Sequence, residues 1–123
     1  MIETTERFLR EIADRIGAGL VEEIRLFPPL RQGGTESAVA IVASSADPHP
    51  WHTVYSARYR HTLKGHDRGK WEVEVTAEAD APLVTVDEVV RGVMKRAGEP
   101  FEPERISAAA FRSIVGYSEQ PEG

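Results

Sequence analysis

The sequence predicts an α+β fold: a four-stranded, mainly antiparallel sheet arranged as a meander, with one N-terminal helix and two C-terminal helices. Two observations predict it. Apolar residues recur at helical spacing near both ends of the chain, and they alternate with polar residues along its middle. The expected order of elements is α-β-β-β-β-α-α. We expect one domain over residues 1–117 and a disordered tail over residues 118–123.

The first predicted element is an amphipathic helix near the N-terminus. Its apolar positions recur at helical spacing and are Phe8, Leu9, Ile12, Ala13 and Ile16. Thr4 or Thr5 can cap its start. Glycines at positions 17 and 19 end the helix, because glycine readily adopts the left-handed conformation found at helix C-termini.

Two strands are expected after this helix. Residues 20–26 have the irregular alternation of an edge strand, and Pro28 and Pro29 interrupt pairing because proline has no N–H to donate. Residues 37–43 are apolar at both alternating sets of positions, which is typical of a strand covered on both faces. The second strand therefore needs a cover on each side.

A β-hairpin over residues 51–79 is the most clearly patterned element. Apolar and polar residues alternate through both of its halves, and glycines at positions 65 and 69 flank a turn. The predicted register pairs Leu63 with Trp71. It places Arg60 opposite Glu74, so arginines of the first strand face glutamates of the second. We expect a ladder of charges that neutralises itself.

Two helices are predicted after the hairpin. Thr85 and Glu88 form a capping box, in which each side chain accepts from a free backbone N–H, and the helix begins at Val86. The second helix is predicted to begin at Pro103, or after Ser107 as its N-cap, and to reach residue 115.

Composition excludes several classes of function. The chain contains no cysteine, which removes disulfides, thiolate metal sites and cysteine nucleophiles. Its longest apolar run, residues 38–43, is far too short to span a membrane, and the N-terminus lacks the pattern of a signal peptide, so we expect a cytoplasmic protein with no membrane partner. The net charge of −5 means that any site for a polyanion must be local.

A basic cluster in the hairpin is the first candidate site, a surface for a polyanion such as nucleic acid. Its members are Arg58, Arg60, Lys64, Arg68 and Lys70. The alternation of side chains along each strand disfavours a nucleic-acid surface here. Tyr59 and Trp71 occupy the apolar face of the hairpin, whereas the strand arginines occupy the other face.

The histidines and carboxylates do not predict a reactive centre. His52 and His61 would lie about 30 Å apart along one strand and point to opposite faces, so they cannot share a metal ion. The acids Glu72 and Glu74 are flanked by arginines, which favour the ionised carboxylate and so disfavour a role as general acid. We expect no metal, no cofactor and no catalytic residue, so the sequence favours a protein that is not an enzyme over one that is.

The doubly apolar strand indicates a surface for a second copy of the chain. If the helices cover the apolar face of the hairpin, then Ala38, Ala40 and Val42 lie on the opposite face. Either one helix crosses to that face, or a partner copy covers it.

These patterns favour a non-catalytic binding or assembly module that acts as a homodimer. One alternative is a nucleic-acid-binding hairpin. Another is a small-ligand-binding protein or enzyme, its ligand unidentified, with a pocket between helices and sheet lined by Tyr55, Tyr59, His61 and Trp71.

Overall fold

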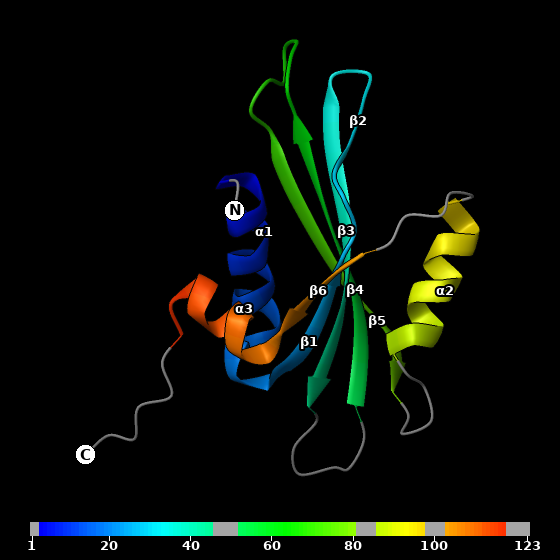
Figure 1. The fold of residues 1–123 in the computed structure, drawn as a ribbon. Helices are drawn as coiled ribbons and strands as arrows, with labels where there is room; N and C mark the ends of the chain where they lie inside the picture. Colours follow the sequence, from blue (N-terminus) through cyan, green and yellow to red (C-terminus); the bar gives the residue numbers. More distant parts are fainter. Residues whose placement is uncertain (1–2, 46–51, 81–85, 98–102, 118–123) are drawn as a thin grey trace.

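A six-stranded antiparallel sheet with helices on both faces forms the protein (Figure 1). The computed structural model describes residues 3–45, 52–80, 86–97 and 103–117. The helical elements are α1 (Glu3–Ile12), a π-helical turn (Ala13–Gly17), a 3-10 turn (Ala18–Leu20), α2 (Val86–Ala97) and α3 (Ala108–Val115). The strands are β1 (Val21–Leu26), β2 (Leu30–Gln32), β3 (Thr35–Ser45), β4 (His52–Thr62), β5 (Trp71–Asp80) and β6 (Glu104–Ser107). Their order is β5-β4-β3-β1-β6, and β2 also pairs with β3.

The α+β class with an antiparallel sheet is confirmed, but the expectation of four strands is wrong. Both additional strands are short. β2 resumes pairing with β3 after the two prolines, at Leu30 opposite Ser37, because proline interrupts a ladder only locally. β6 pairs with β1 at the far edge, where the helix predicted from Pro103 is instead extended chain. The alternative start of this helix, after Ser107 as its N-cap, is confirmed: Ser107 Oγ accepts a hydrogen bond from Ala110 N at 3.2 Å and caps α3.

The helices divide between the two faces of the sheet. α1 and α3 lie on one side, here called the inner face, and α2 lies on the other, the outer face (Figure 1). The buried Val90 of α2 packs there with Phe27, Ile41 and Val54. One helix therefore crosses to cover the doubly apolar strand, the first of the two arrangements considered from sequence.

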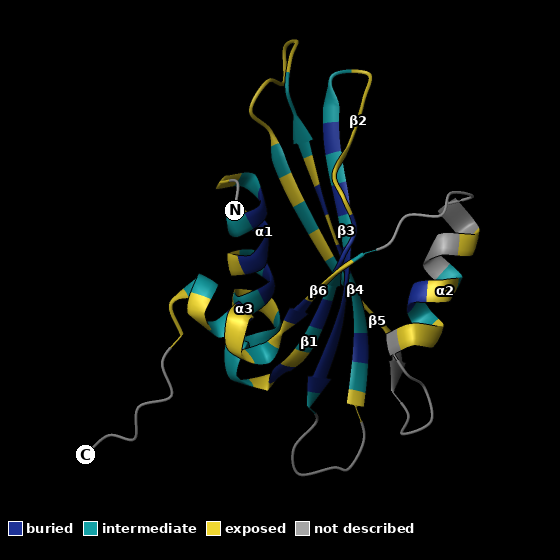
Figure 2. Ribbon diagram, in the orientation of Figure 1, coloured by how far each residue is buried: buried dark blue, intermediate teal, exposed yellow. Residues whose placement is uncertain are grey.

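The proposed dimer surface lies inside the chain's own core. Cross-strand neighbours share a face, and the register places Ala38 opposite Tyr59, and Val42 opposite Tyr55. Ala38, Ala40 and Val42 therefore lie on the inner face with the hairpin's aromatic residues, and all three are buried. The expectation that they occupy the opposite face is wrong. Figure 2 shows burial along most of β3, which is covered on both sides.

The hairpin is present within the described residues, and Trp51 lies outside them. The predicted parity holds, but the predicted register is wrong by two residues: Trp71 pairs with His61, so Arg60 faces Glu72. The cause is a tertiary hydrogen bond, because the N–H of Leu63 leaves the ladder and donates to the carbonyl of Gly34 at 2.8 Å. The turn is longer as a result.

Candidate functional site

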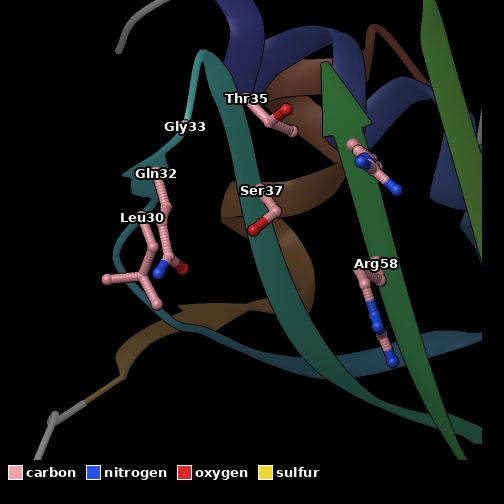
Figure 3. A pocket seen from close by; sticks show the side chains of 7 residues that line it. Leu30, Gln32, Gly33, Thr35, Ser37 and Arg58 are labelled. Carbon is pink, nitrogen blue, oxygen red and sulfur yellow. The ribbon is translucent and has the colours of Figure 1, made fainter. Parts of the chain in front are cut away.

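A groove of about 450 Å³ opens on the outer face of the sheet, between β2 and β4. Figure 3 shows Leu30 and Gln32 on one side of it and Arg58 on the other, with Ser37 between them. The residues that line it are Leu30, Gln32, Gly33, Thr35, Ser37, Arg58 and Arg60. Its volume lies within the range of about 300–1,000 Å³ that is typical of small-molecule sites.

Strand pairing brings these side chains to one face. Leu30 lies opposite Ser37 on β3, and Ser37 lies opposite Arg60 on β4. The β2–β3 turn requires Gly33 and Gly34, whose φ values of 60° and 81° favour glycine. A side chain at Gly34 would also collide with Lys64, since its Cβ would stand 2.7 Å from Cε of the lysine. The groove therefore depends on a tight turn.

Two guanidinium groups give the groove its charge. Within the described part of the chain, neither Arg58 nor Arg60 has a carboxylate within 4.0 Å, and neither donates a side-chain hydrogen bond. Their cross-strand partners are Glu74 and Glu72, of which Glu72 pairs instead with Lys70 at 3.2 Å. The ion pairs expected from the sequence between these arginines and glutamates are therefore not formed.

The groove offers donors that suit an anion. Guanidinium groups bind carboxylate and phosphate oxygens with strong, directional hydrogen bonds. The hydroxyls of Thr35 and Ser37 and the amide of Gln32 add neutral donors. At the rim, Leu30 is 52% exposed and can contact an apolar part of a ligand. The set therefore fits a small molecule with an acidic group and an apolar body.

The other three basic residues of the predicted polyanion surface do not line this groove. Lys64 packs against the β2–β3 turn at Gly34, and Lys70 is paired with Glu72. Arg68 is exposed in the hairpin turn, where its N–H donates to the carbonyl of Gly65 at 3.2 Å. The structure brings together Arg58 and Arg60 with residues of β2 and β3.

The residues of the predicted aromatic pocket lie on the inner face and pack on one another. Tyr59 stacks on Trp71 with ring centroids 4.8 Å apart, and His61 meets the edge of Trp71 at 5.7 Å. The rings of Phe8 of α1 and Tyr59 make an edge-to-face contact with centroids 4.9 Å apart, and Tyr55 lies half-buried against the same core. These rings fill the interface between sheet and helix.

A buried carboxylate adjoins this aromatic stack. Glu36 is 4% exposed, accepts from Tyr59 Oη at 2.8 Å and accepts from Arg31 Nε at 2.9 Å. Burial by itself raises the pKa of Glu36, but the hydrogen bonds from Tyr59 and Arg31 outweigh it and hold the pKa below its usual value. Burial and the neighbouring Glu36 raise the pKa of Tyr59. Glu36 therefore remains an ionised acceptor with both oxygens engaged.

The remaining polar side chains do not converge. His52 Nδ1 lies 3.1 Å from Glu22 Oε2 on the neighbouring β1, whereas His61 lies beside Trp71. No group of three or more metal-binding side chains occurs in the described ranges. None of the helices in the described segments is both long and apolar enough to cross a membrane.

Comparisons with known proteins give no match: no family model, no curated protein and no solved structure is significantly similar to the chain. The geometry and chemistry of its own residues are therefore the basis for a function.

Sequence reasoning found the two arginines of the groove and missed its other side. Arg58 and Arg60 stand out because they alternate with apolar residues on a patterned strand. Gln32 was missed because β2 has only three residues, too few for a visible period, and Thr35 and Ser37 were missed because they stand at the polar start of β3, before its apolar run. The available signal was the Gly33–Gly34 pair, a common hairpin turn, between two short polar segments.

Proposed function

We propose that the protein is a non-catalytic binding module, and that the groove between β2 and β4 takes a small ligand with a phosphate or carboxylate group. One observation carries this proposal: Arg58 and Arg60 line the same groove, and neither has a carboxylate partner within the described residues. A bound anion would supply that partner.

The charge distribution favours a small ligand. The chain carries a net charge of −5, so its overall field repels an extended polyanion, while two adjacent guanidinium groups attract an anion at short range. A hydrogen bond to a charged group contributes about 1.5–3 kcal/mol. Two such contacts, together with hydrogen bonds from the hydroxyls of Thr35 and Ser37, would favour a bound anion.

Nucleic acid is a less suitable ligand for this surface. Binding to single strands relies on aromatic side chains that stack on bases beside the cations. Tyr59 and Trp71 lie on the inner face, against α1, whereas Arg58 and Arg60 are on the outer face. The homodimer expected from the sequence stays a prediction, and it would have to use a surface other than Ala38, Ala40 and Val42.

Titration with sodium pyrophosphate and with citrate, followed by NMR, tests the proposal. At low salt we expect shifts in the Nε–H signals of Arg58 and Arg60 and in the amide signals of Gln32 and Ser37. The double variant Arg58→Gln/Arg60→Gln should lose these shifts.

Arg68→Gln is the matched control, because it removes an exposed arginine from the turn of the same hairpin. It should bind both anions as the unmodified chain does. An equal loss in this control would assign the effect to the hairpin tip, and an absence of shifts with either anion would refute the proposal.

A further inference from the structure

β5 forms one edge of the sheet. Among the described residues it pairs with β4 alone, whereas each interior strand pairs on both sides. Its only irregularity is a bulge at Glu78, so the stretch from Trp71 to Ala77 is regular. Such a stretch presents a row of backbone N–H and C=O groups to an incoming strand.

The opposite edge of the sheet is different. β6 has only four residues, and Arg105 within it forms an ion pair with Glu23 of β1. Short edge strands are one of the usual protections against unwanted pairing. β5 has ten residues, and neither proline nor lysine occurs among them. β5 is therefore the longer of the two edge strands and the better template for pairing with an added strand.

The two faces of β5 define what an added strand should carry. On the inner face Trp71, Val73 and Val75 are only half-buried, although they pack against the core. On the outer face Glu72 and Glu74 are exposed. A new strand would match these faces with apolar residues on one side and cations on the other.

The charge pattern across the outer face leads to the same chemistry. The arginines of β4 lie directly opposite the glutamates of β5, as Arg58 opposite Glu74 and Arg60 opposite Glu72. A strand added beside β5 would continue this alternation of basic and acidic strands if its outward side chains were basic. Each opposite-charge pair across strands contributes about 0.2–1 kcal/mol, and like charges directly opposite destabilise.

A second copy of β5 does not meet this requirement. Antiparallel pairing of two copies about Val73 places Glu72 opposite Glu74, and pairing about Glu74 places that residue opposite itself. Pairing about Val75 places Glu72 opposite Glu78. In these three registers the glutamates disfavour self-association of the edge, and they leave it open to a basic strand.

We propose that the β5 edge, over Trp71 to Ala77, binds an extended segment of a partner protein in which Lys or Arg alternates with apolar residues. The segment adds a strand to the sheet, its main chain bonds to β5, its cations face Glu74 and, in exchange for Lys70, Glu72, and its apolar side chains cover Val73 and Val75. This surface is separate from the anion groove, which lies beyond β4 on the β2 side.

Two short capped peptides test the proposal, one alternating lysine with valine and the other alternating glutamate with valine. Hydrogen exchange followed by NMR is the readout. The lysine peptide should protect alternate β5 amides, those whose N–H points away from β4, and leave β6 amides unchanged. The glutamate peptide should protect none.

Charge reversal gives the matched variants. Glu74→Lys should weaken the lysine peptide by about fivefold to tenfold, because one attractive pair becomes repulsive. Glu104→Lys makes the same change on the opposite edge strand and should have no effect. Equal protection by both peptides, no protection by either, or β5 amides already protected by a dimer of the free chain would each overturn the proposal.

Discussion

Tyr59 Oη donates a hydrogen bond to Glu36 Oε1 at 2.8 Å, and this contact joins β4 to β3 beneath α1. The second oxygen of the same carboxylate accepts from Arg31 on β2. A buried charge is tolerated only when its hydrogen bonds are satisfied, and here both oxygens are. The contact therefore helps to fix the end of the sheet that carries the groove on its other face.

Removing this hydroxyl should destabilise the fold. Tyr59→Phe keeps the ring stacked on Trp71 but leaves Glu36 with one donor in a buried site. We expect the free energy of unfolding in urea to fall by about 1–3 kcal/mol. Tyr55→Phe removes a hydroxyl from a half-buried tyrosine of the same strand and should cost much less. Equal losses in the two variants would show that the Tyr59–Glu36 contact is not stabilising.

The low pKa of Glu36 predicts a pH dependence of stability. Burial raises this pKa, but the hydrogen bonds from Tyr59 and Arg31 lower it by more than burial raises it. The pKa of Glu36 in the folded protein therefore lies below the usual 4.5. A depressed folded pKa gives stability that is complete above the unfolded pKa and is lost as pH falls through the folded value. The advantage of the unmodified chain over Glu36→Gln should therefore be constant near neutral pH and shrink below about pH 4.5.

Urea unfolding of both proteins across this pH range measures that difference, because the other carboxyl groups are common to the two chains. An advantage that stayed constant into the acid, or grew there, would contradict the assigned direction of the shift.

The position of α2 on the outer face is tested by its buried valine. Val90→Ala removes packing against Ile41 and Val54 and should cost about 1–3 kcal/mol in unfolding free energy. Lys95→Ala changes an exposed position of the same helix and should cost less than about 0.5 kcal/mol. Equal effects would mean that α2 does not cover the outer face.

The sequence predicted elements whose periodicity was long enough to read. Alternation over residues 51–79 predicted the hairpin and placed its aromatic residues and arginines on different faces, as the structure confirms. The register could not be read, because it depends on the bond from Leu63 to Gly34, two residues far apart in the chain.

The groove was predictable only in part for a similar reason. Arg58 and Arg60 belong to a long strand with a clear period, but their partners across the groove belong to β2 and the start of β3. A strand of three residues between prolines and glycines has no period to detect. The misplacement of Ala38, Ala40 and Val42 arose from an undetermined register between neighbouring strands, which local pattern does not fix.

Isothermal titration with pyrophosphate at low salt, comparing the chain with Arg58→Gln/Arg60→Gln and with Arg68→Gln, tests the anion groove most directly. The proposed anion groove predicts saturable binding to the unmodified chain and to the Arg68 variant, and an affinity at least about tenfold weaker in the double variant. Equal affinities in all three proteins, or no saturable binding to any of them, would contradict it.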